Sequence, residues 1–207
     1  MKIICIGRNY VDHAQELDNA IPSRPLIFLK PESSILRKGR PFSIPTWSQE
    51  IHHEIEVVLR IGRPGKSIPK TEALDYFTEV GLGIDFTARD LQSELKAYGH
   101  PWERAKAFDD SAVIGDFVSI DCLKTSIDNL PFELRNHGTV LQEGNTSNMI
   151  FSFAELIAEI TTFLTLEEGD LIFTGTPAGV GPVKDGDLLE GFLDGQSLLQ
   201  LEISKFQ

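Results

Sequence analysis

Short apolar runs separated by turn residues make up most of this chain, and their pattern predicts a strand-rich fold. Runs rich in Ile, Val, Leu and Phe that end at Gly, Pro, Asn or Asp are typical of β-strands. We therefore expect a strand that ends at Ile84 and further strands over residues 2–6, 26–30, 52–61, 112–120, 131–136, 139–144, 171–175, 187–193 and 197–204.

Helical periodicity is clearest in three segments, residues 9–17, 87–99 and 152–164, and residues 71–80 are compatible with one further short helix. The third repeats apolar residues at helical spacing behind a serine, a favourable N-cap residue. The second begins with Thr87 and has Asp90 three positions later, which is typical of a capping box. Strands outnumber helices and do not alternate with them as in a βαβ fold. We predict one α+β domain over residues 1–207.

Composition and charge exclude several classes of partner. A chain of 207 residues with 41% hydrophobic residues can bury one substantial core. Its net charge of −12 argues against nucleic-acid binding, which requires clustered Lys and Arg. The apolar N-terminal stretch is too short for a signal peptide, and no window approaches the roughly 18 apolar residues of a membrane span. We expect a cytoplasmic protein without a nucleic-acid or membrane partner.

Three carboxylates in or beside predicted strands indicate a metal site. Glu54 and Glu56 are two residues apart in the strand predicted over 52–61, so they share one face. Asp85 follows an apolar run at the junction between a strand and a helix. If these strands are neighbours, the all-oxygen cluster suits Mg²⁺ or Mn²⁺ better than zinc, for which no Cys or His spacing is present. The alternative is a strand with a solvated acidic face.

Six segments, which follow one another in the family's order, carry a resemblance. They are GRNYVDHAQE at 7–16, FLKPESS at 28–34, the strand with Glu54 and Glu56, the strand end with Asp85, WERAKAF at 102–108 and GDLIFTGTPAGVG at 169–181. From about residue 3 to about residue 204 the chain resembles the fumarylacetoacetate hydrolase superfamily, in its short branch of acylpyruvases and fumarylpyruvate hydrolases. The resemblance implies a twisted mixed β-roll and a homodimer. Arg8, Lys30 and Ser34 lie in the same motifs without an assigned step.

The resemblance also implies which residues surround the metal. Three carboxylates and one divalent cation leave a charge near −1, so an anionic substrate requires nearby basic groups. On residue type alone, Arg89 would be a surface ion-pair residue and Lys106 a solvated loop lysine. By resemblance, Lys106 lies in the active site and stabilises an enolate, Arg89 and Gln92 hold the far end of the substrate, and Thr176 contacts its carboxylate.

His13 and Glu16 are three positions apart and therefore face the same side of a helix. Spacing alone would fit a surface pair. In short members of the family this motif forms a lid, so residues 9–20 are interpreted as a mobile lid in which Glu16 orients His13 as a general base. One departure from the family, AFDDSAVIG at 107–115, affects the expected substrate preference.

The leading hypothesis is a metal-dependent hydrolase that cleaves the carbon–carbon bond of acylpyruvates or related 2,4-dioxo acids to give pyruvate and a carboxylic acid. In it, the metal binds the 2-oxo acid group, His13 activates water and Lys106 stabilises the pyruvate enolate. Two alternatives need the enolate but not the water: decarboxylation of oxaloacetate, and isomerisation or tautomerisation of an unsaturated 2-oxo dicarboxylate. A further alternative is a noncatalytic protein with a structural ion.

Overall fold

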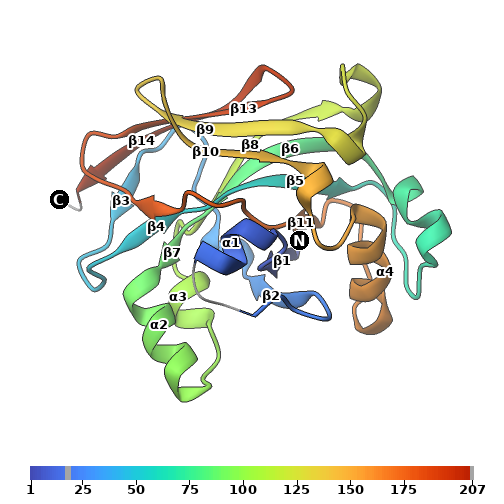
Figure 1. Ribbon diagram of the computed structural model, residues 1–207, viewed down its shortest axis with the longest axis horizontal. Coiled ribbons are helices and arrows are strands. Elements are labelled where there is room, and N and C mark those ends of the chain that lie inside the picture. Colours follow the sequence, from blue (N-terminus) through green and yellow to red (C-terminus); the bar gives the residue numbers. More distant parts are fainter. Residues whose placement is uncertain (17–19, 206–207) are drawn as a thin grey trace.

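Three β-sheets form the framework of the protein (Figure 1). The computed structural model describes residues 1–16 and 20–205. The largest sheet is mixed and has the order β2-β1-β11-β5-β6-β8, in which only β1 and β11 are parallel. Its strands are β1 (Ile3–Gly7), β2 (Leu26–Lys30), β5 (Ile55–Ile61), β6 (Phe77–Asp85), β8 (Ala112–Ser119) and β11 (Leu171–Phe173).

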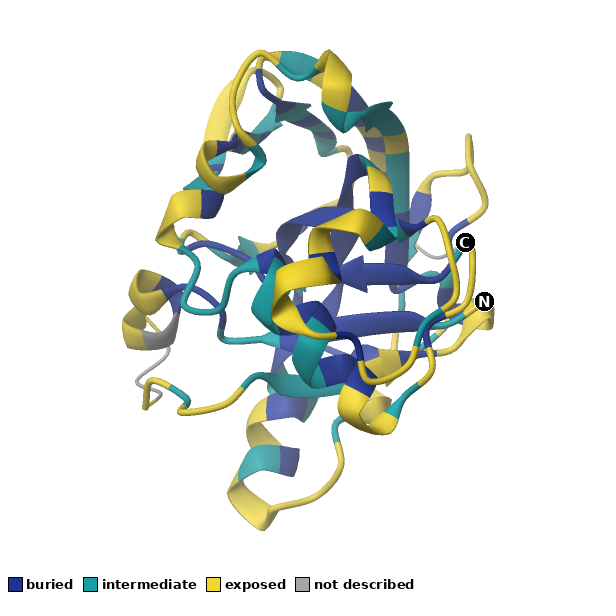
Figure 2. Cartoon of the chain, turned by 90° about the vertical axis from the view of Figure 1, so that its right-hand side faces the viewer, coloured by how far each residue is buried: buried dark blue, intermediate teal, exposed yellow. Residues whose placement is uncertain are grey.

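The other two sheets pack around this one. The five-stranded sheet has the order β10-β9-β13-β14-β3, and the three-stranded sheet has the order β12-β4-β7. Their strands are β3 (Phe42–Ile44), β4 (Ile51–His53), β7 (Thr87–Ala88), β9 (Pro131–Asn136), β10 (Thr139–Asn145), β12 (Gly181–Pro182), β13 (Leu188–Leu193) and β14 (Gln196–Lys205). Figure 2 shows the buried residues along the central strands and the exposed residues on loops and helix surfaces.

Four α-helices lie outside the sheets in the described part of the chain. They are α1 (Val11–Glu16), α2 (Arg89–Tyr98), the single turn α3 (Glu103–Lys106) and α4 (Phe153–Phe163). Five short 3-10 segments accompany them: η1 (Glu32–Ser34), η2 (Lys70–Tyr76), η3 (Ile120–Cys122), η4 (Ile127–Asn129) and η5 (Thr146–Asn148). The strand-rich α+β prediction is therefore confirmed, and none of the described helices is long and apolar enough to span a membrane.

Local signals placed most helix ends correctly. The α4 helix begins with the predicted N-cap, because the Ser152 hydroxyl accepts from the Glu155 N–H and the Glu155 carboxylate accepts from the Ser152 N–H. The α2 helix ends at Gly99 with φ of 66°, a conformation that favours glycine. The helix predicted over 9–17 is found as α1, while residues 17–19 of the predicted lid lie outside the described residues.

Two local predictions were wrong, and both concern residues around Glu54. The strand predicted over 52–61 is broken at Glu54, so that β4 and β5 belong to different sheets. Thr87 does not cap α2, since its hydroxyl donates to Glu54 Oε1 at 3.0 Å, while the N-cap position is Ala88. Asp90 instead accepts from the Ser48 hydroxyl at 2.7 Å. Tertiary contacts have replaced the local cap in both residues.

Candidate active site

Sheet pairing brings the three predicted carboxylates together. Glu56 lies in β5 and Asp85 ends the neighbouring strand β6, and the Asp85 N–H donates to the carbonyl oxygen of Glu54 at 2.9 Å. The break after β4 leaves Glu54 beside them. One oxygen from each carboxylate lies within 4.8 Å of the others, and the residues are 4%, 2% and 0% exposed. The alternative of a solvated acidic face is therefore excluded for these residues.

Lys106, in α3, contacts two of these carboxylates. Its Nζ lies 2.8 Å from Glu54 Oε2, 2.6 Å from Asp85 Oδ2 and 2.6 Å from the Thr87 hydroxyl. Asp85 and Glu54 raise the pKa of Lys106 even though burial opposes the charge. For Glu54, burial favours the neutral acid, but Lys106 and Arg89 outweigh it and hold the pKa of Glu54 far below its usual range. Lys106 and Glu54 are therefore both ionised at neutral pH.

Lys30, to which no catalytic step was assigned, is a second buried ammonium in this network. Its Nζ lies 2.8 Å from Asp85 Oδ1 and 2.9 Å from the Ser111 hydroxyl, and it also donates to the main-chain oxygens of Lys106 and Ser111. The residue is 1% exposed. Lys30 thus fixes the positions of the Asp85 side chain and of the Lys106 backbone.

Glu56 is the carboxylate that lacks a cation of its own among the described residues. It accepts from the Gly175 N–H at 2.6 Å. Burial, together with the neighbouring charges of Asp85 and Glu54, raises the pKa of Glu56 well above its ordinary value. A cation bound between the three carboxylates would relieve this repulsion.

The residues present fit a hard divalent cation. Glu54, Glu56 and Asp85 supply only oxygen atoms, they converge within a small space, and the ionisation of one of them is unfavourable without added positive charge. Mg²⁺ and Mn²⁺ prefer such ligands, whereas the nearby His and Cys residues form no zinc-like cluster in the described chain. These three side chains would hold the metal.

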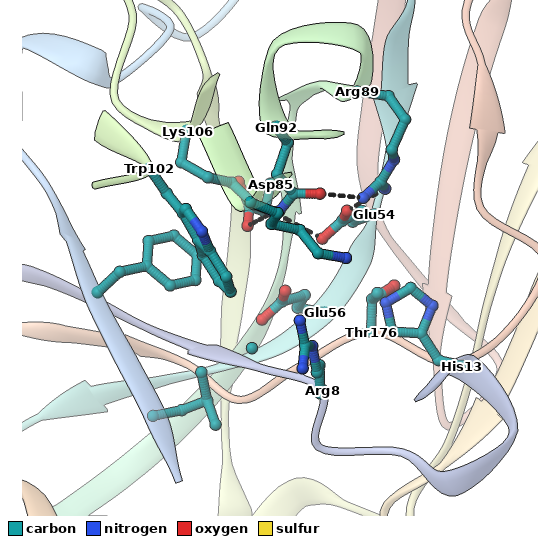
Figure 3. A pocket seen from close by; sticks show the side chains of 14 residues that line it. Arg8, His13, Glu54, Glu56, Asp85, Arg89, Gln92, Trp102, Lys106 and Thr176 are labelled. Carbon is teal, nitrogen blue, oxygen red and sulfur yellow. Dashed lines mark hydrogen bonds and ion pairs between the residues drawn. The ribbon is translucent and has the colours of Figure 1, made fainter. Parts of the chain in front are cut away.

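His13, on α1, lines this pocket (Figure 3), and Glu16 on the same helix pairs with it. His13 Nδ1 lies 3.3 Å from Glu16 Oε2, and Glu16 Oε1 accepts from the Gly179 N–H at 3.0 Å. His13 is 4% exposed while Glu16 is exposed, so a surface position is excluded for the imidazole. Burial lowers the pKa of His13 despite the nearby Glu54 and Glu16, so the imidazole is neutral at pH 7 and can accept a proton.

Arg89 and Gln92 occupy the first turn of α2 and both are buried. Arg89 donates to Glu54 Oε1 through Nη2 and to the Gln92 side-chain oxygen through Nη1, the latter at 2.6 Å. The alternative of a surface ion pair is therefore excluded for Arg89, because its guanidinium lies directly beside a buried metal-ligand candidate. In this position it can bind a substrate close to the metal rather than only at its far end.

Thr176 lines the same pocket, but its hydroxyl is already engaged. The hydroxyl donates to the Ile55 carbonyl oxygen at 2.8 Å and accepts from the Gln142 side-chain amide at 2.8 Å. Gln142, which the sequence analysis missed, also accepts from the Ile55 N–H at 3.1 Å and from His53 Nδ1 at 2.8 Å. Within the described residues, the Thr176 N–H has no such partner, so the backbone is the group that remains for a substrate carboxylate.

The pocket also has walls that were not predicted. Besides the residues above, it is lined by Arg8, Phe28, Lys96 and Trp102. Figure 3 shows the Arg8 side chain entering the pocket from the side opposite Arg89. A basic and aromatic wall thus faces the carboxylates. These four residues were not predicted as site residues because their sequence context carries no chemical signature of its own.

Comparison with known proteins identifies the family of this chain. The family model described as fumarylacetoacetate (FAA) hydrolase, C-terminal, matches residues 2–203. The chain is 40% identical over 203 residues to oxaloacetate tautomerase FAHD1, mitochondrial, of Mus musculus, covering 98% of this chain and 91% of that protein. It is 45% identical over 190 residues to oxaloacetate decarboxylase, mitochondrial, of Dictyostelium discoideum, covering 91% of this chain and 87% of that protein.

A solved structure extends the agreement to the whole fold. Fumarylpyruvate hydrolase from Pseudomonas aeruginosa, crystallised in complex with Mn²⁺ and pyruvate, superposes with a TM-score of 0.91 at 33% identity, covering 100% of this chain and 90% of that one. The predicted resemblance and the β-roll fold are therefore confirmed. On the family match over residues 2–203 and on these relatives, the chain belongs to the fumarylacetoacetate hydrolase family of enzymes.

Proposed function

We propose that the protein is an oxaloacetate tautomerase that uses Mg²⁺ or Mn²⁺ and interconverts the keto and enol forms of this 2-oxo dicarboxylate. The observation that carries the proposal is one pocket lined together by the three carboxylates, the Lys106 ammonium and the neutral imidazole of His13. The relatives named as acting on oxaloacetate support this alternative more strongly than the leading hypothesis of an acylpyruvate hydrolase.

The charge of the pocket supports a substrate with two carboxylates. Its lining includes four cationic side chains, those of Arg8, Arg89, Lys96 and Lys106, against three carboxylates. A divalent cation would add two further positive charges. These cationic side chains supply the positive charge that an anionic substrate was expected to need beside the three carboxylates and a metal, and they favour the dianion oxaloacetate over the monoanion acetylpyruvate.

His13, Glu16 and Lys106 have separate roles in the proposed enolisation. His13 Nε2 accepts the C3 proton of the keto form, while Glu16, bound to Nδ1, keeps the ring in the tautomer that has Nε2 free. Lys106 stabilises the negative charge that develops on the C2 oxygen. That oxygen takes up a proton from solvent to complete the enol, and His13 then releases the C3 proton to solvent, so there is no net gain or loss of protons. When bound, the divalent cation supplies Lewis-acid polarisation of the 2-oxo acid.

Decarboxylation of oxaloacetate is a second candidate, favoured by the 45% identity to the Dictyostelium enzyme of that name. Loss of the C4 carboxylate yields the same type of enolate without removal of a C3 proton, so Lys106 is needed and His13 is not. Hydrolysis of a fumarylpyruvate-like substrate remains a prediction supported by the Pseudomonas structure. The homodimer, the lid over residues 9–20 and the cytoplasmic location also remain predictions.

The variant His13→Ala separates these reactions. With Mn²⁺ present, we expect it to lose most tautomerisation, followed as the ultraviolet absorbance of enol-oxaloacetate, while any decarboxylation, followed as pyruvate formation, persists. His100→Ala is a matched control, since His100 is exposed and does not line the pocket. Full tautomerase activity in His13→Ala would contradict the role of His13. Equal activity of the wild type with Mn²⁺ and with EDTA would contradict the metal requirement.

A further inference from the structure

One face of α2 runs along the pocket. Arg89, Gln92 and Lys96 all line it, at spacings of three and four residues that place them on the same side of the helix. Arg89 contacts Glu54, which fixes the inner end of this row at the carboxylate cluster. Lys96 lies two turns, about 10 Å along the helix axis, beyond Arg89. The face therefore leads from the metal-ligand candidates to a second cation further out.

Arg8 supplies a cation from a different element. It directly follows Gly7, the last residue of β1, and has φ of 57°, which non-glycine residues adopt rarely. Its guanidinium carbon lies 5.9 Å from the centroid of the Trp102 ring. Among the described residues, no carboxylate lies within 4.0 Å of the Arg8 guanidinium, although the side chain is half-buried.

Arg8 and Lys96 are close enough for the charge of Arg8 to lower the pKa of Lys96. Burial lowers the pKa of Lys96, and Arg8 and then Arg89 lower it further. Burial also lowers the pKa of Arg8. Cations that are partly removed from water and repel one another gain most from an anion that binds between them. Phe28 and Trp102, which also line the pocket, add an apolar wall for the carbon chain of a ligand.

We propose that Arg8 and Lys96 form a distal subsite that binds the second carboxylate of a 2-oxo dicarboxylate, so that the enzyme selects diacids over monoacids. This inference rests on the proposed function, because it assigns the substrate class of the same pocket. In this arrangement the 2-oxo acid group lies at the three carboxylates and Lys106, and the other end of the substrate lies against the distal subsite.

Binding of a matched pair of non-substrates tests the distal subsite directly. The ligands 2-oxoglutarate and 2-oxopentanoate have the same length and the same 2-oxo acid group, and differ in whether the far end is a carboxylate or a methyl group. Titration calorimetry of the Mn²⁺-loaded protein gives the ratio of their Kd values. We expect the wild type to bind 2-oxoglutarate at least about ten-fold more tightly, which corresponds to one well-placed charge interaction.

The variants Arg8→Gln, Lys96→Gln and their combination should reduce this preference. In the double variant we expect the ratio to approach one, through weaker binding of 2-oxoglutarate, while 2-oxopentanoate changes less than about two-fold. Arg8→Lys, which keeps the charge, should retain much of the preference. The pair Arg40→Gln and Lys66→Gln removes two exposed cations outside the pocket and controls for net charge.

Two results would overturn the distal subsite: a wild-type ratio near one, or an equal loss of affinity for both ligands in the double variant, which would indicate general damage to the pocket. The test does not depend on turnover. If the ratio behaves as expected but oxaloacetate is not enolised, the proposed function fails and the distal subsite stands. If oxaloacetate is enolised but the ratio is insensitive to the variants, the distal subsite fails and the proposed function stands.

Discussion

Replacement of Lys106 by methionine tests the electrostatic design of the site. The change keeps an unbranched side chain of similar length and removes the ammonium that lies 2.8 Å from Glu54 and 2.6 Å from Asp85. Both carboxylates then remain buried with less compensating charge. We expect Lys106→Met to be less stable than the wild type in EDTA, and to be stabilised by Mn²⁺ more than the wild type is.

The size of the effect follows from burial. The Lys106 side chain is 4% exposed and those of its partners are 6% and 1% exposed, so solvent screens these pairs little. Removal of one partner from a buried ion pair costs about 3–5 kcal/mol. For a chain of this length each kcal/mol lowers Tm by about 2–4 °C, which gives a decrease of roughly 6–20 °C. A cation present at a free concentration of 100 times its Kd would add about 2.7 kcal/mol to the free energy of unfolding.

Thermal unfolding of the wild type and of Lys106→Met, each with EDTA and with saturating Mn²⁺, measures these differences. Lys38→Met is a suitable control, because Lys38 pairs with Asp116 while both side chains are largely exposed, and we expect its Tm to change by less than about 2 °C. Equal Tm values for Lys106→Met and the wild type in EDTA would show that the buried carboxylates do not depend on the Lys106 ammonium for their stability. An equal gain from Mn²⁺ in both proteins would show that the metal and Lys106 do not share ligands.

Other predictions concern the groups around the cluster. Tautomerisation should be constant above pH 6.5, the ordinary pKa of histidine, and decline as the pH falls through the lowered pKa of His13, because only the neutral ring accepts a proton; a pH–rate profile with an apparent pKa above 6.5 would contradict this. Gln142→Leu should lower the unfolding free energy by about 1–3 kcal/mol for each buried partner left unsatisfied, as measured by urea denaturation. A variant as stable as the wild type would be inconsistent with the four hydrogen bonds of Gln142. Gly175→Ala should weaken Mn²⁺ binding in calorimetry, because φ at Gly175 is 104° and an added Cβ would lie 2.6 Å from a neighbouring side chain. The resulting shift would displace the Gly175 N–H that donates to Glu56. Gly39→Ala, also at positive φ but in open space, should bind Mn²⁺ as the wild type does.

The carboxylate cluster could be predicted because its geometry follows from short-range rules. Side chains two residues apart share a face in extended backbone, so Glu54 and Glu56 converge even though the strand is interrupted at Glu54. Asp85 joins them because β5 and β6 are sequence neighbours that pair as antiparallel strands. The helix ends at Gly99 and Ser152 are likewise set by residues adjacent in sequence.

The remaining site residues depend on contacts between distant segments. Lys30 ends a strand without a local signal of burial, yet its ammonium is buried by oxygens from Asp85 and Ser111, more than 50 residues away. Gln142 lies in a strand whose alternation gives no hint that its amide reaches Thr176. The hydroxyl of Thr87 binds Glu54 instead of capping its helix, because the buried carboxylate is the better acceptor. Such contacts leave no periodic signal in the sequence.

The most direct measurement is the initial rate at which the purified protein interconverts keto- and enol-oxaloacetate, alongside cleavage of acetylpyruvate and fumarylpyruvate, each with Mg²⁺, with Mn²⁺ and with EDTA. We predict metal-dependent enolisation of oxaloacetate that exceeds pyruvate release from all three substrates and that is lost in Glu54→Gln. Rapid metal-dependent cleavage of acetylpyruvate or fumarylpyruvate, with enolisation of oxaloacetate no faster than without enzyme, would contradict the proposed function and return the hydrolase hypothesis to first place.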